Sequence, residues 1–255
     1  MIPPAPMATT TTSAAMGIPY PMPDCEPRRL GSDLFHALSQ PLTALCCSLE
    51  LALQHTPTAE QYRESVSTAL SQAERVSWLA MGMRELFDAG QAGEDCEILL
   101  LQVAVESAIA DVLLVAEVAG VRISCLPRSP CPVWFEAQRL RSGLFHLLGF
   151  VVGCGDRGSV VKIELKECGE QALLALTVSG AGPANPQASS SNAGEGDRPQ
   201  ELARRLGLGI ARATFEAAGG SFRAERSLES TSVEIRLPRA GARVSAGPLL
   251  TLPKV

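Results

Sequence analysis

The sequence predicts an α+β protein in which a helical hairpin forms a dimeric four-helix bundle and a two-layer α/β sandwich follows. Residues 30–89 repeat apolar side chains at alternating spacings of three and four, as helices that pack side by side do. After residue 95 the helical period mixes with alternation of apolar and polar residues, which indicates helices and strands within one domain.

These patterns divide the chain into four parts. We expect a disordered Pro- and Thr-rich leader at 1–28, the hairpin at 29–92, the sandwich at 95–240 and a tail at 241–255.

The composition excludes several classes of protein. The 255 residues are 46% hydrophobic and 19% charged, so the chain can bury a substantial core. A formal charge of -5 without a cluster of Lys and Arg argues against a nucleic-acid partner. The eight cysteines include no C-x-x-C pair and no Cys/His set at zinc spacing, so we expect reduced thiols and no metal site.

The placement of charges predicts a cytoplasmic protein that has no membrane segment. The first charged residue is Asp24, so the amino end lacks the basic region of a signal peptide. The most apolar stretch, residues 98–123, carries Glu106, Asp111 and Glu117, which a lipid core would resist.

The hairpin is predicted from two apolar runs separated by a break at 55–58. Thr58 and Gln61 have the spacing of a capping box, and Gly90 and Gly93 end the second helix. The first seam consists of Phe35, Leu38, Leu42, Leu45, Leu49 and Ala52, and the second of Tyr62, Val66, Ala69, Ala73, Val76, Ala80, Met83 and Phe87. Two such helices rarely bury their own seams, so we expect a homodimer; the alternative is a monomeric hairpin docked on the next domain.

The second domain is predicted to contain three helices and five strands. Gly169 marks a turn between two strands, and the pair Gly219-Gly220 ends the last helix. A loop rich in Ser, Pro, Asn and Gly precedes that helix at 183–200. The helices are expected at 105–119, 136–152 and 201–218, and the strands at 121–126, 161–165, 174–178, 221–227 and 231–237.

One short motif points to a known family. Residues 35–45 read Phe-His-Ala-Leu-Ser-Gln-Pro-Leu-Thr-Ala-Leu, which resembles the H-box of bacterial histidine kinases, especially those with Gln-Pro-Leu after the histidine. The order of segments over residues 30–240, including 139–159, is similar to the dimerisation domain and the GHKL-type ATPase domain of that family. The resemblance implies that His36 is the phosphoacceptor and that the partners are receiver domains of response regulators.

The position of His36 suits that role. With Phe35 and Leu38 on the seam, His36 faces outward, and an exposed imidazole keeps a lone pair near neutral pH that can attack a phosphoryl group. Gln40, one turn further on, shares this face and could orient a water or a phosphoryl oxygen, while Pro41 can bend the helix. The alternative is a solvated surface histidine on an ordinary helix pair.

Three positions depart from the family pattern. Ala37 replaces the acidic residue that usually follows the histidine, so a general base is missing there. Phe150 falls where the family's asparagine supplies an oxygen to magnesium, which a phenyl ring cannot do. Gly180 replaces the aspartate that accepts a hydrogen bond from adenine. We therefore expect impaired autophosphorylation.

Three glycines resemble the remains of a nucleotide site. Gly182 belongs to the stretch that contains Gly180, and Gly207 and Gly209 resemble the second glycine box, with Arg205 where its first glycine belongs. A glycine-rich turn at the start of a helix could still cradle a phosphate. The alternative is that small residues allow a helix to pack closely on its neighbours.

Three functions follow as hypotheses. The first is a phosphorelay protein that has lost the use of ATP and exchanges phosphoryl groups between His36 and receiver aspartates, without a cofactor. The second is an active, divergent histidine kinase fed by a separate sensor, which would need ATP and Mg²⁺. The third is a non-catalytic scaffold that binds response regulators.

Overall fold

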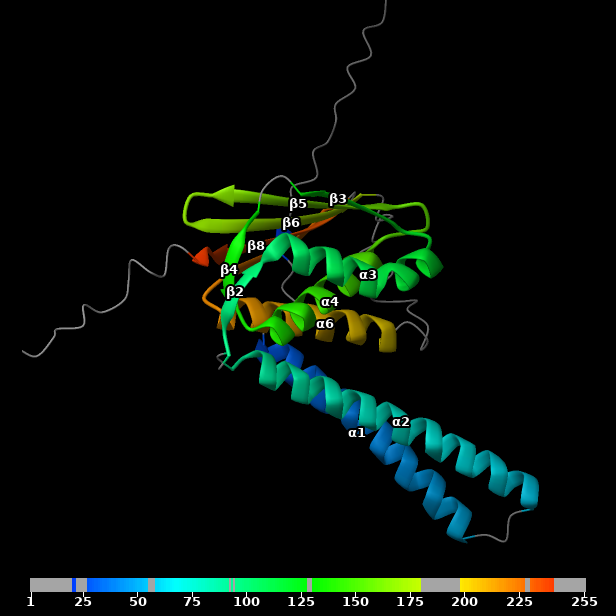
Figure 1. Ribbon diagram of the computed structural model, residues 1–255. Helices are drawn as coiled ribbons and strands as arrows, with labels where there is room; N and C mark the ends of the chain where they lie inside the picture. The colour runs from blue at the N-terminus through cyan, green and yellow to red at the C-terminus, as the bar shows by residue number, and fades with distance from the viewer. Residues whose placement is uncertain are drawn as a thin grey trace, which may run out of the picture.

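The computed structural model describes residues 20–21, 27–54, 58–91, 93, 95–127, 130–179, 198–227 and 230–240. The expected tail, Gly180, Gly182 and nearly all of the expected leader and of the 183–200 loop lie outside these residues. A helical hairpin projects from a second part in which helices pack on one side of a sheet (Figure 1).

The hairpin consists of α1 (Pro27–Gln54) and α2 (Ala59–Ala89). The predicted capping box is present: the Gln61 backbone N–H donates to Thr58 Oγ1 at 3.3 Å, and the Thr58 N–H donates to Gln61 Oε1 at 2.9 Å. Helix α2 ends at Gly90, as predicted. These caps satisfy backbone groups that the turn would otherwise expose.

The predicted seam on α1 is really two faces. Leu34 and Pro41 are buried and Leu38 is half-buried on the face toward α2 and the second domain, whereas Phe35 is 64% exposed. Leu42 and Leu49 share the exposed face with Phe35. Within one chain Phe35 therefore does not share a buried stripe with Leu38, because one partner helix covers only one stripe of a helix that carries two.

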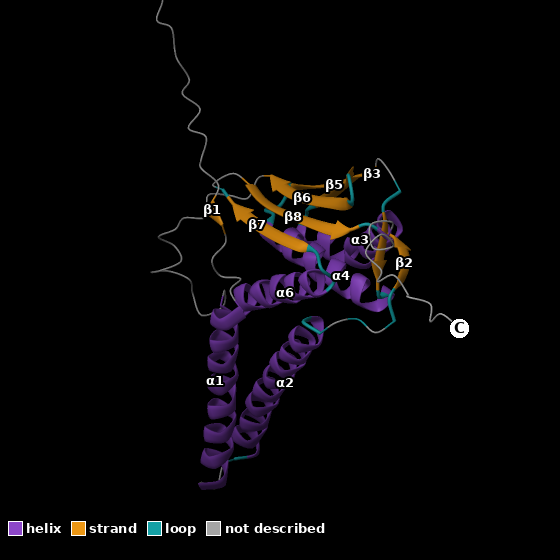
Figure 2. Cartoon of the chain, turned by 90° about the vertical axis from the view of Figure 1, so that its left-hand side faces the viewer, coloured by secondary structure: helices purple, strands orange, loops and turns teal. Residues whose placement is uncertain are grey.

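The second part is the predicted two-layer sandwich. Its six-stranded sheet has the order β1-β7-β8-β6-β5-β3, with β3 and β5 parallel and the other neighbours antiparallel. The helices α3, α4 and α6 cover one face, and α6 separates the sheet from the hairpin (Figure 2). The bounds are α3 (Leu101–Ala119), β3 (Arg122–Pro127), α4 (Ala137–Cys154), β5 (Val160–Cys168), β6 (Gln171–Ser179), α6 (Arg198–Ala217), β7 (Ser221–Arg226) and β8 (Ser230–Pro238).

Three short strands escaped sequence analysis. β2 (Glu97–Leu100) and β4 (Pro132–Phe135) form a separate two-stranded ribbon. β1 (Tyr20–Pro21) pairs with the edge strand β7, so the expectation that the whole leader is disordered is wrong for these two residues. Runs of two or four residues are too short for their period to stand out from the flanking sequence.

The core lies between the sheet and its helices. Inward residues of β5, β6 and β8 alternate with exposed or half-buried ones, and they meet the apolar faces of α3, α4 and α6. Phe135 and Phe215 pack edge to face at 6.1 Å between ring centroids. In the described part of the chain, no helix combines the length and apolar character that crossing a membrane requires.

Candidate functional site

His36 lies on an exposed face of α1, close to the second domain. Its imidazole is exposed, whereas Leu34 is buried and Ala37 is half-buried on the opposite side of the helix. The amide nitrogen of Gln40 lies 3.4 Å from His36 Nε2. An amide N–H can only donate, so this contact fits a tautomer whose lone pair is on Nε2 and whose proton is on Nδ1.

The helix beneath His36 is held by a small interdomain core. Leu30 and Leu34 of α1 and Leu79 of α2 pack against two residues of α6, Leu206 and Ile210. All five are at most 3% exposed, so this cluster is as dry as the centre of the sandwich.

Glycines allow the helices to approach closely. A Cβ at Gly209 would lie 2.6 Å from Leu30 Cδ2, and a Cβ at Gly82 would lie 2.3 Å from Leu206 Cδ2. Gly209 of α6 and Gly82 of α2 therefore each make room for a leucine of the other domain.

Polar contacts surround this core. Arg205 of α6 forms an ion pair with Asp33 of α1 at 2.7 Å, one turn before His36. Arg139 of α4 donates to the carbonyl oxygens of Asp88 and, at 3.0 Å, of Ala89, at the carboxyl end of α2. These oxygens are among the last carbonyls of α2, which have no partner one turn further on in the helix, and a guanidinium hydrogen-bonds to such groups well.

Glu85 of α2 is the acidic centre of the α2–α4 contact. Its Oε1 accepts from Ser142 Oγ at 2.8 Å and from His146 Nε2 at 2.8 Å. Burial, the largest single influence, acts to raise the pKa of Glu85, but the hydrogen bonds from His146 and Ser142 and the charge of His146 together outweigh it. The net effect lowers the pKa of Glu85 below its ordinary value of 4.5.

This lowered pKa predicts that the contact between α2 and α4 stabilises the folded chain less in acid. The carboxylate is favoured in the folded chain, so its contribution to stability is complete above pH 4.5 and is lost as the pH falls through the lower, folded pKa. We expect the difference in unfolding free energy between the wild type and Glu85→Gln to be largest near neutral pH and to shrink below pH 4.5, as measured by denaturant unfolding. Glu74→Gln, an exposed change on the same helix, serves as the control. A difference that stays constant down to pH 3 would contradict this assignment.

Of the residues matched to a nucleotide site, the structure describes Phe150, Gly207 and Gly209. Phe150 is 4% exposed and packs in the sandwich core, so it supplies no oxygen to a metal. Gly180 and Gly182 lie outside the described residues. Among the residues that the structure describes, no group of three or more His, Cys, Asp and Glu could hold a metal ion.

The structure corrects the expectation of a glycine-rich turn at the start of a helix. Gly207 and Gly209 lie inside α6, which begins at Arg198, so neither stands at a helix start. Gly207 faces the His146 backbone oxygen, 3.6 Å from where its Cβ would be, and Gly209 faces Leu30. Both glycines are buried at helix contacts, which is the close-packing alternative. The helix continues here because good helix formers precede the pair from Glu201 to Leu206 and follow it from Ala211 to Ala213.

Sequence reasoning missed the interdomain contacts. Glu85 belongs to no motif, the family-like stretch 139–159 gave no role to Arg139 or His146, and Asp33 and Arg205 are 172 residues apart in the chain. The one available signal was a charged residue on an otherwise apolar helix face, because such a residue needs a partner when that face is buried.

Three comparisons relate the chain to known proteins. No family model matches it. It is 25% identical over 209 residues to the sensor protein IrlS of Burkholderia pseudomallei (strain K96243); the match covers 76% of this chain and 43% of IrlS, so the chain spans less than half of that curated relative. The structure of Acinetobacter baumannii histidine kinase AdeS has a TM-score of 0.56 at 19% identity, covering 80% of this chain and 98% of that one. Full-length ShkA, solved in complex with AMPPNP, has a TM-score of 0.52 at 18% identity, covering 84% of this chain and 46% of that one.

Proposed function

The chain has the fold of the histidine kinases, with a catalytic domain of the GHKL type, and from this premise we propose that it is a phosphorelay protein of two-component signalling. His36 is the phosphoacceptor, and it exchanges phosphoryl groups with aspartates of response-regulator receiver domains. The sensor protein relative supports the signalling role.

One observation carries the proposal: the acceptor face is open while the position matched to the magnesium ligand is filled. His36 and Gln40 are exposed side by side on α1, where a second protein can reach them. Phe150 belongs to the core. A protein that receives phosphoryl groups from a receiver needs the first feature and has no need of a nucleotide.

The transfer requires little from this chain beyond the imidazole. The Nε2 lone pair of His36 attacks the phosphorus of the aspartyl phosphate, a P–N bond forms, and the P–O bond breaks to release the aspartate carboxylate. The reverse step loads the next receiver. The Gln40 amide N–H, which contacts Nε2 in the free chain, has to turn away from the lone pair as the phosphorus approaches, and it can then donate to the phosphoryl oxygens and orient the group.

Several features argue against ATP use. Ala37 offers no general base beside His36. Arg205 is fixed to Asp33, and the face of α6 that carries Gly209 is occupied by Leu30 and Leu86 of the hairpin. Binding of a nucleotide along α6 would have to displace this contact. The divergent-kinase hypothesis is therefore less well supported than the relay.

Two sources of phosphate test the proposal. The purified chain is incubated with ³²P-labelled phosphorylated receiver domain in one arm and with labelled ATP and Mg²⁺ in the other. We expect acid-labile label on the chain only in the first arm. Label from ATP would establish the divergent kinase, and stable binding of receivers without transfer would establish the scaffold.

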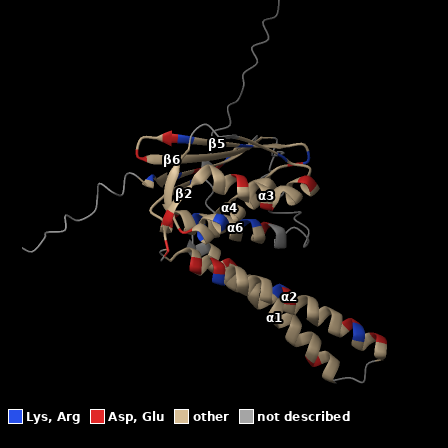
Figure 3. Cartoon of the chain, in the orientation of Figure 1, with Lys and Arg blue, Asp and Glu red and all other residues tan. Residues whose placement is uncertain are grey.

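We also propose that the hairpin pairs with a second copy to form a four-helix bundle. The exposed stripe on α1 consists of Phe35, Leu42, Leu49 and Leu53, and α2 carries exposed apolar residues as well: Tyr62, Val66, Leu70, Met81 and Phe87. Few charged residues interrupt the α1 surface (Figure 3). By helical geometry His36 is about 120° around α1 from this stripe, so pairing leaves the imidazole open.

Leu49→Asp is expected to dissociate the dimer. The side chain is 44% exposed in the single chain, so a charge costs that fold little, but it cannot be buried unpaired between two copies. Sedimentation equilibrium should report twice the chain mass for the wild type and the single mass for the variant. Leu51→Asp is the matched control, since Leu51 is also exposed but points to the opposite side of α1. Equal masses for wild type and Leu49→Asp would remove the bundle.

A further inference from the structure

Helix α3 has apolar residues on both sides. Its inner face packs in the sandwich core through Leu101, Val105, Ala108, Val112 and Ala116. Its outer face is apolar too: Leu114 is 70% exposed and Val118 is 74% exposed, and Val103 and Val115 are exposed beside them. Bulky apolar side chains gathered on the exposed face of a helix mark a surface that another molecule covers.

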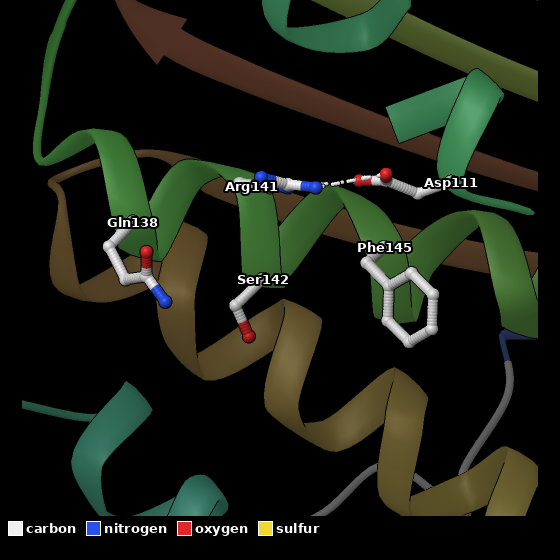
Figure 4. Close-up of a pocket in the computed structure, with 5 residues that line it drawn as sticks. All are labelled: Asp111, Gln138, Arg141, Ser142 and Phe145. Carbon is white, nitrogen blue, oxygen red and sulfur yellow. Dashed lines mark hydrogen bonds and ion pairs between the residues drawn. The ribbon is translucent and has the colours of Figure 1, made fainter. Parts of the chain in front are cut away.

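A groove continues this face onto α4. It is lined by Asp111, Gln138, Arg141, Ser142 and Phe145 and has a volume of about 390 Å³ (Figure 4). Asp111 receives two hydrogen bonds from Arg141, each 2.9 Å long, which fix α3 against α4 at this point. One turn further along each helix lie Val115 and Phe145, both exposed. We call Val103, Leu114, Val115, Val118 and Phe145 the α3–α4 surface.

The outer face of α3 has the spacing that a partner helix needs. Val103, Ser107, Ala110, Leu114 and Val118 follow one another at intervals of four, three, four and four residues. The bulky residues stand at the ends of this row, and the small Ser107 and Ala110 between them let another backbone approach closely. Grooves that bind amphipathic helices are read at these intervals.

The charges around the surface select the occupant. α3 carries Glu106, Asp111 and Glu117 and has no Lys or Arg, as the red positions in Figure 3 show. The guanidinium of Arg141 is held by Asp111, and the Arg157 side chain packs over Gly120 beyond the end of the helix. Two copies of α3 would meet acid against acid, and an anionic lipid surface would be repelled. A helix with Lys or Arg beside its apolar stripe complements both the apolar row and its acidic margins.

We propose that the α3–α4 surface is a docking site for a basic amphipathic helix of a partner protein. The apolar stripe of that helix covers Leu114, Val118 and Phe145, and its Lys or Arg residues lie next to Glu106 and Glu117. None of the five residues of the α3–α4 surface belongs to α1 or α2, so the proposed site is separate from His36.

Two synthetic helical peptides test the site on the full chain. Both have the same leucine stripe, but Lys flanks it in one and Glu in the other. Fluorescence anisotropy should show binding of the Lys peptide only, weakening with added salt. Leu114→Gln and Val118→Gln should each weaken binding about tenfold or more. Ile98→Gln, a change at another exposed apolar residue, on β2, should leave binding unchanged. Unchanged unfolding midpoints establish that these surface variants fold.

Charge reversal gives the sharper outcome. The double variant Glu106→Lys, Glu117→Lys should lose the Lys peptide and gain the Glu peptide. Equal binding of both peptides to the wild type, or binding that ignores Leu114→Gln, overturns the proposal. Self-association, or binding to phosphatidylglycerol vesicles, that Leu114→Gln abolishes would assign the surface to a second copy or to a membrane and would also overturn it.

Discussion

His36→Ala is expected to reduce transfer of label from a phosphorylated receiver to background. The imidazole is the only group on this face of α1 that can form the P–N bond, and methyl replaces it without loss of any buried contact, since the ring is exposed. The measurement is acid-labile ³²P on the chain after mixing with the labelled receiver. Circular dichroism of the variant should match that of the wild type.

The other histidines provide the controls. His146→Ala removes a hydrogen bond to Glu85 and should lower stability while label still reaches His36. His55→Ala controls for label on a third imidazole. Transfer that continues in His36→Ala and stops in either control would move the acceptor elsewhere and end the relay assignment for His36.

Phe150→Asn is expected to destabilise the chain strongly without creating a nucleotide site. Truncation of a buried phenyl ring costs about 3–5 kcal/mol, and the new amide has no partner in an apolar core. The midpoint temperature of thermal unfolding should fall by about 10 °C. Isothermal titration with Mg-ATP should give no heat of binding for the variant or the wild type.

Phe145→Asn is the matched control on the same helix. Phe145 is 43% exposed, so the same chemical change should shift the midpoint by far less. Tight Mg-ATP binding by Phe150→Asn would mean that one side chain separates this chain from nucleotide binding, which would revive the divergent-kinase hypothesis.

The regular elements were predictable because their signals are local. The Thr58–Gln61 capping box and the alternation along β5, β6 and β8 each depend on residues a few positions apart. The same holds for the outward position of His36, which follows from its neighbours on one helix. The H-box resemblance added the phosphoacceptor role that we propose for this histidine.

The interdomain contacts were not predictable because their signals are distant. Leu30 and Leu34 read as ordinary apolar residues until α6 covers them, and Arg205 reads as a lost glycine until Asp33 faces it. Gly207 and Gly209 also show that a local signal alone can have two meanings. A glycine permits either a phosphate or a neighbouring side chain to come close, and only the fold around it decides which.

The shared leucine cluster also bears on modularity. Cleavage of the chain near residue 93 would separate the two halves of this cluster. One fragment would expose Leu206 and Ile210, and the other would expose Leu30, Leu34 and Leu79. Each fragment would then expose an apolar patch that the intact chain buries, and it would tend to aggregate or to bind chaperones. A domain that replaced either one would therefore need apolar side chains that fit the matching half of this cluster.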